Sequence, residues 1–138
     1  MIGRMTERNN MITWVDDYVH KEFSSGGHMG EDGVAWCRVS KKWMTAFLKR
    51  LGATEIKFRK GHYEWSMFAL LKGQYWYFSS GDCRFKSMVS LLVRKADSPT
   101  DYTGQGNMWV NYDVPDFEYS LERLLTLGGQ QTPHGWRF

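Results

Sequence analysis

Three consecutive strand-like segments between residues 55 and 80 constrain the fold of this chain more than any other feature. The segments 55–60, 62–71 and 74–80 are separated by the turn sequences Gly61-His62 and Lys72-Gly73. Short turns join antiparallel neighbours, so the pattern predicts an antiparallel meander. Further β-rich apolar runs predict a fourth strand over 88–94 and a short fifth strand over 108–112.

Helical patterns lie on both sides of the predicted strands. Apolar side chains recur at helical spacing over residues 8–23, and the glycine-rich stretch 24–33 predicts a loop. A second helix is expected from an N-cap at Ser40 to a left-handed terminator at Gly52. Its apolar stripe is Trp43, Met44, Phe47, Leu48 and Leu51, while Lys41, Lys42, Lys49 and Arg50 should be exposed.

A last helix is expected after Asp113 or Asp116, with Gly128-Gly129 ending it. Its apolar face consists of Phe117, Leu121, Leu124 and Leu125. We expect the tail 130–138 to be mobile, although Trp136 and Phe138 have the bulk to dock.

The order of these elements predicts the fold class. We expect an α+β protein with an antiparallel sheet of four or five strands and about three helices packed on one face. The chain has 138 residues, of which 42% are hydrophobic, and it shows no repeat or linker. A single domain over residues 1–138 is therefore expected.

The sequence also predicts the cellular setting. There is no apolar run of membrane-spanning length and no apolar segment typical of a signal peptide near the start. The only cysteines, Cys37 and Cys83, are read as reduced thiols of a cytoplasmic protein. The histidines show no paired metal-ligand spacing, so neither a metal nor a cofactor is expected.

Charge is distributed unevenly along the chain. Residues 38–95 hold thirteen Lys and Arg against three acids, a net charge of +10, and the remaining residues have a net charge of −7. The same central segment is rich in aromatic residues. Cations neutralise phosphates and flat rings stack on bases, so this composition favours an anionic partner such as a nucleic acid or a nucleotide.

Two groups of residues are candidate binding sites. Alternation along the strands places Lys57, Arg59, Tyr75 and Tyr77 on the outer face of the sheet, away from the helices. The alternative for this group is that tyrosines pair across strands and lysines keep a sheet edge soluble. The second group is Arg84 and Arg94 with the backbone of Thr103, Gly104, Gln105 and Gly106, which can form an anion cradle or a simple hairpin turn.

Part of the chain resembles a known group of proteins. The stretch 73–84, with Leu92-Val93-Arg94-Lys95-Ala96 and Asp101-Tyr102-Thr103-Gly104, is similar to short uncharacterised accessory proteins of bacteriophages and conjugative elements of gut bacteria. The resemblance covers about a quarter of the chain. It implies a mobile-element accessory role, such as handling nucleic acid or blocking a host defence.

These observations favour a small non-enzymatic binding protein whose central basic-aromatic surface engages an anionic partner. A membrane is not expected among its partners. A host protein is a second possible partner. One alternative is an enzyme acting on a phosphorylated or nucleotide substrate with Asp82, Arg84, Arg94 and Asp101. Another is a structural protein that oligomerises through exposed aromatic residues.

Overall fold

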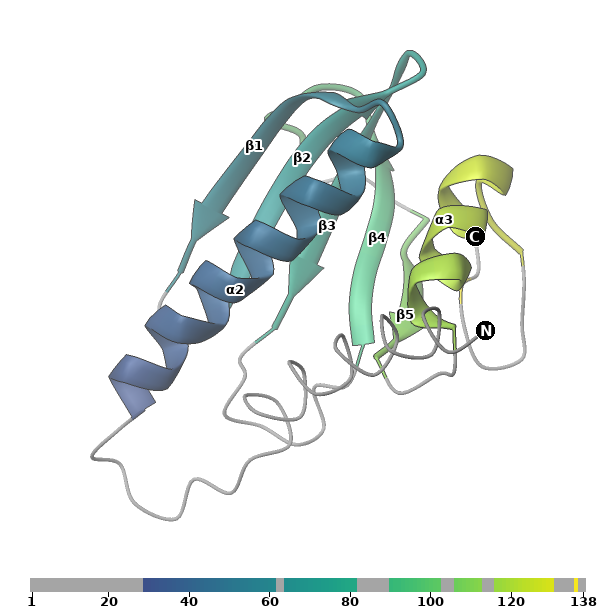
Figure 1. Cartoon of the computed structure of the whole chain (residues 1–138). Helices are drawn as coiled ribbons and strands as arrows, with labels where there is room; N and C mark the ends of the chain where they lie inside the picture. The colour runs from purple at the N-terminus through teal and green to yellow at the C-terminus, as the bar shows by residue number, and fades with distance from the viewer. Residues whose placement is uncertain are drawn as a thin grey trace.

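The computed structural model describes residues 29–61, 64–81, 90–102, 106–112, 116–130 and 136, with side chains from residue 36 onward. These ranges contain two helices and five strands (Figure 1). In chain order they are α2 (Met29–Arg50), β1 (Thr54–Lys60), β2 (Trp65–Leu71), β3 (Gln74–Ser80), β4 (Ser90–Ala96), β5 (Met108–Asn111) and α3 (Phe117–Leu127).

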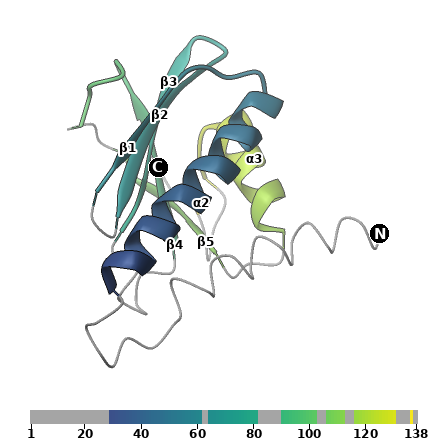
Figure 2. The same ribbon diagram turned by 60° about the vertical axis from the view of Figure 1, so that its left-hand side comes forward.

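The strands form one antiparallel sheet in the order β1-β2-β3-β4-β5. Both helices lie against the same face of this sheet (Figures 1 and 2). The predicted α+β class, the meander and the fifth strand are therefore confirmed. The described residues contain two helices instead of about three, and the helix predicted over 8–23 lies outside them.

The start of α2 corrects the sequence prediction. The helix begins at Met29, so part of the predicted loop 24–33 is helical, and Ser40 is a buried mid-helix residue instead of an N-cap. Trp36 and Cys37 are almost fully buried and extend the apolar stripe toward the N-terminus. Tertiary packing of such a stripe outweighs the helix-breaking tendency of the glycines.

The other end of α2 follows the prediction. Gly52 has a φ of 94°, its N–H donates to the Lys49 carbonyl, and the Ala53 N–H donates to the Leu48 carbonyl. This pair of hydrogen bonds is the Schellman arrangement, which needs a left-handed residue at Gly52. The predicted stripe is confirmed as well, since Met44, Phe47 and Leu48 are buried and Trp43 and Leu51 pack at its margin.

The hairpin between β2 and β3 fixes which side chains face the helices. Lys72 and Gly73 both have positive φ, at 51° and 82°, as a tight two-residue turn between twisted strands requires. In the resulting register Trp76 and Phe78 point into the core, and Tyr75 and Tyr77 point to the opposite face. The alternation predicted for β3 is thus confirmed.

The C-terminal region closes the core at β5. The predicted apolar face of α3 is buried, and Gly128 ends the helix with a φ of 79°. Trp136 is also buried: its backbone N–H donates to the Trp109 carbonyl at 2.6 Å and its indole Nε1–H donates to Ser120 Oγ at 3.1 Å. Trp136 belongs to the tail predicted to be mobile, 130–138, and it docks on β5 and α3 as its bulk allowed.

Candidate functional site

The sheet face opposite the helices carries a compact group of rings. Phe68 on β2 lies opposite Tyr77 on β3, and Tyr102 follows β4 in a segment that folds back over this face. The Phe68 ring centroid is 5.1 Å from that of Tyr77 and 5.1 Å from that of Tyr102, and the Tyr77 and Tyr102 centroids are 5.8 Å apart. We call Phe68, Tyr77 and Tyr102 the outer aromatic cluster. Phe68 is buried beneath the two tyrosines, while Tyr102 is 43% exposed.

Two arginines border the outer aromatic cluster in different ways. The guanidinium of Arg59, an exposed residue of β1, lies 5.8 Å from the Tyr102 ring centroid. The guanidinium of Arg94 lies 4.2 Å from the Tyr77 ring centroid, and Arg94 is only 6% exposed. Arg59 therefore presents its charge to solvent beside an accessible ring, whereas Arg94 is largely covered.

The contacts of Arg94 tie the folded-back segment to the sheet. One terminal nitrogen donates to the Asp101 carbonyl at 3.2 Å. Asp101 in turn accepts a hydrogen bond from the Asp97 backbone N–H at 3.0 Å. Arg94 Nε is buried and has no hydrogen-bond partner among the described residues. Arg94 thus holds the backbone before Tyr102 in place.

The four outer-face residues expected from the sequence do share this face. Lys57 and Arg59 are exposed on β1, and Tyr75 and Tyr77 are half-buried on β3. Tyr75 points its hydroxyl to Glu55, which accepts at 2.7 Å, and this hydrogen bond raises the pKa of Tyr75. Tyr77, not Tyr75, therefore joins the ring cluster.

The second predicted group falls only partly within the structure. Arg94 and Gly106 are described, and Gly106 has a positive φ of 81°. Arg84, Thr103, Gly104 and Gln105 lie outside the described residues, as do Asp82 and Cys83. Of this group, Arg94 is the described residue that contacts the outer aromatic cluster, through the ring of Tyr77.

Sequence reasoning missed Phe68 and Tyr102 as members of the site. Phe68 sits in an apolar run, Trp65–Leu71, that is buried at most positions, so its face is readable only from the register. Tyr102 lies in a polar segment, and only tertiary structure brings it over β2 and β3. The sequence feature that could have indicated Tyr102 is that it is the one aromatic residue of the polar segment 98–107.

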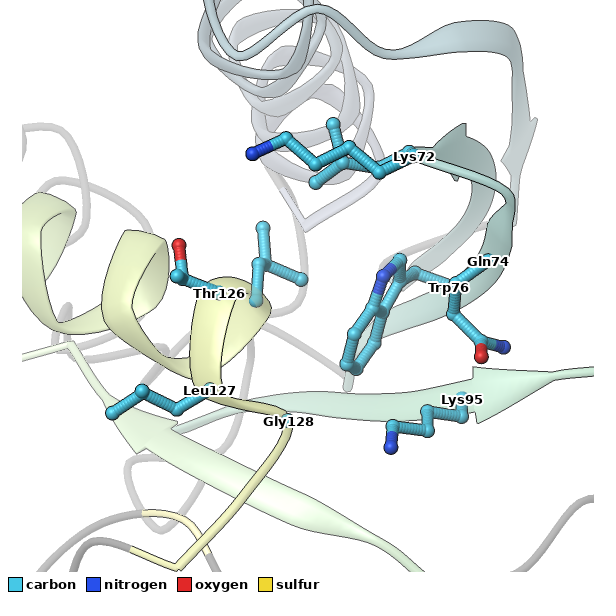
Figure 3. A pocket seen from close by; sticks show the side chains of 9 residues that line it. Lys72, Gln74, Trp76, Lys95, Thr126, Leu127 and Gly128 are labelled. Carbon is cyan, nitrogen blue, oxygen red and sulfur yellow. The ribbon is translucent and has the colours of Figure 1, made fainter.

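A separate cavity of about 270 Å³ opens on the helix side of the sheet, between the β2–β3 turn and the end of α3 (Figure 3). Lys72, Trp76, Lys95 and Gly128 are among its lining residues.

The ammonium group of Lys95 lies beside the C-terminal end of α3. A Cβ atom added to Gly128 would be 3.1 Å from Lys95 Nζ. Because the last turn of α3 has no basic residue of its own, Lys95 supplies the cation that the helix dipole favours there. The charge of Lys95 thus has a role in the fold.

Reactive and metal-binding groups are sparse in the described part of the chain. It contains no cluster of three or more potential metal-ligating side chains, and all four histidines lie outside it. Cys37 is buried with its thiol 3.4 Å from the Glu64 carbonyl, and burial raises its pKa, which favours the unreactive thiol. Neither described helix is long and apolar enough to cross a bilayer.

Comparison with known proteins gives no relative from which a function can be transferred. No family model, curated protein or solved structure matches this chain.

Proposed function

We propose that this protein is a small non-enzymatic binding protein that holds single-stranded nucleic acid on the outer face of its sheet. The observation that supports this most is the pairing of Arg59 with Tyr102, an exposed cation 5.8 Å from the centroid of an exposed ring. Lys57 adds a second exposed cation on the same strand face.

The chemistry of the two partners explains why a single strand fits. A base has two flat faces that stack on an aromatic ring regardless of its sequence, and such stacking contributes about 1–3 kcal/mol per base. Lys and Arg side chains that neutralise the phosphates of the strand release counterions, which adds salt-dependent affinity. In a duplex the faces of the bases are already stacked on one another, so Tyr102 has no partner there.

The internal rings give this surface its rigidity. Phe68 and Tyr77 support Tyr102 from below, edge against face, and Arg94 fixes the preceding backbone. A ring held in one orientation loses little conformational entropy when a base stacks on it.

The biological setting is a further part of the proposal. The resemblance of the segments 73–84, 92–96 and 101–104 to accessory proteins of mobile elements supports a role in a phage or conjugative element, where a strand-binding protein would shield nucleic acid from a host defence. Efficiency of plating of a phage on nuclease-defended bacteria, with and without expression of this chain, tests that role.

The binding proposal is tested by fluorescence anisotropy with a labelled oligothymidylate and the matching duplex at two salt concentrations. Tyr102→Ala should weaken single-strand binding roughly 5- to 150-fold, the equivalent of one lost stacking contact. Arg59→Gln should weaken it and reduce its salt dependence.

The chain offers a matched control for both variants. On α3, Arg123 lies 5.6 Å from the ring centroid of the exposed Tyr119, which repeats the Arg59–Tyr102 geometry away from the outer face. Tyr119→Ala and Arg123→Gln should leave affinity nearly unchanged. Equal losses in the two pairs, or binding that ignores Tyr102, would contradict the proposed site.

A further inference from the structure

We infer that the bound strand does not stop at the outer face but passes around the edge strand β1 and continues along α2, where only its phosphates are contacted. This inference rests on the proposed function. It assigns a role to cations on the opposite side of the sheet, which the outer-face site does not use.

The sequence of α2 over residues 36–50 contains five cations and no acid. With 3.6 residues per turn, Arg38, Lys41, Lys42 and Lys49 fall within an arc of roughly 100° on the helix surface. All four are exposed. We call these four residues the α2 basic stripe.

The fifth cation, Arg50, shows what an ion-paired residue looks like on this helix. It lies outside the arc and contacts two carboxylates of α3, those of Glu118 and Glu122. No ion pair involves the α2 basic stripe within the described residues.

On a solvated helix face, opposite charges three or four positions apart stabilise the helix, and like charges at that spacing destabilise it. The α2 basic stripe has like charges. Arg38 precedes Lys41 by three positions and Lys42 by four, so like charges are neighbours and repel. An anion bound along the stripe would remove that repulsion.

The α2 basic stripe is continuous with the outer-face site. Lys41 Nζ lies 5.9 Å from the ring centroid of Phe58, which faces the helix side of β1. The neighbours of Phe58 on the same strand, Lys57 and Arg59, face the other side. Since β1 is an edge strand, cations line both of its faces with no strand beyond it.

The length of the stripe sets the size of the extra footprint. Arg38 and Lys49 are eleven positions apart, which spans about 16 Å at 1.5 Å per residue. Neighbouring phosphates of an extended single strand are farther apart than the 3.4 Å rise per strand of a duplex, so the stripe is long enough for only about two or three phosphates. Among the described residues, no exposed aromatic ring lies within the arc of the α2 basic stripe, so we expect this contact to be independent of base identity.

The test compares a short and a long probe, dT5 and dT15, by anisotropy over a series of salt concentrations. The wild-type chain is compared with two double variants: the stripe variant Lys42→Gln/Lys49→Gln and the charge-matched control Lys72→Gln/Arg123→Gln. All four substituted residues are exposed. For dT15 the stripe variant should weaken binding several-fold and lower the salt slope by about 1.4, since each lost contact to a single strand contributes about 0.7. The control should keep the wild-type slope, and dT5 should not distinguish the variants.

Two results would overturn the inference while leaving the proposed function intact. One is equal weakening of dT15 by the stripe variant and the control, which would mean that net charge alone matters. The other is a dT15 slope no steeper than that of dT5. If wild-type protein fails to bind dT5, or binds it without dependence on Tyr102, the proposed function itself fails, and the inference fails with it.

Discussion

Replacing Tyr112 with Phe tests whether the buried end of the core is held as the structure shows. Tyr112 is 1% exposed, and its hydroxyl donates to Ser80 Oγ at 2.8 Å. Its ring packs edge-on against Trp36 and lies 5.3 Å from Phe117. Phe keeps the ring but leaves the buried Ser80 hydroxyl without this partner, so Tyr112→Phe should cost about 1–3 kcal/mol near pH 8.

The same substitution should change how stability depends on pH. Burial raises the pKa of Tyr112 well above the ordinary value, and the hydrogen bond with Ser80 offsets this only in part. An unfolded tyrosine loses its proton near pH 10, while folded Tyr112 keeps it. Because the folded state then binds more protons, this contribution to stability is complete below about pH 10 and is lost above it, at about 1.4 kcal/mol per pH unit.

Phe has no such proton, so the stabilities of wild type and variant should converge as pH rises. The difference of about 1–3 kcal/mol near pH 8 should vanish between roughly pH 11 and 12. Urea unfolding followed by tryptophan fluorescence at several pH values from 8 to 11.5 measures both curves, with Tyr119→Phe as the exposed control. Parallel curves for wild type and Tyr112→Phe would refute this reasoning.

Three other perturbations follow from the packing. Phe47→Ala should lower the free energy of unfolding by about 3–5 kcal/mol in urea titrations, because Phe47 is 3% exposed; a loss below about 1.5 kcal/mol would contradict its core position. Gly128→Ala should lower it by roughly 1 kcal/mol or more, because the residue has a φ of 79° and the new Cβ would crowd Lys95; unchanged stability would refute the strain. Glu55→Gln should bring the pKa of Tyr75 down toward its ordinary value in an ultraviolet titration, since a carboxylate acceptor stabilises the protonated phenol; an unchanged pKa would mean that the hydrogen bond does not form in solution.

The sheet was the most predictable part of the molecule because its signals are local. Gly73 after Lys72 specifies a tight hairpin, and the alternation in Gln74–Ser80 assigns faces without knowledge of the rest of the fold. The end of α2 was equally local, since Gly52 supplies the left-handed residue. The start of α2 was not: the burial of Trp36 and Ser40 depends on the sheet beneath them.

The candidate site was predictable only where it lies on regular strands. Lys57, Arg59 and Tyr77 follow from period-two alternation. The contact between Tyr102 and Phe68 joins residues 34 positions apart through a segment without regular structure, and no sequence period encodes such a contact. The burial of Arg94 has the same origin, because its cover comes from that segment.

We propose that single-stranded nucleic acid lies against Tyr102 on the outer face of the sheet. Photo-cross-linking with an oligonucleotide that carries 5-iodouracil, followed by mass spectrometry of the peptides, locates the contacted ring directly. We expect cross-links to the peptide containing Tyr102, which are lost with Tyr102→Ala and competed by unlabelled single strand but not by duplex. Cross-links concentrated on Tyr119 of α3, or a yield at Tyr102 that duplex competes equally well, would contradict it.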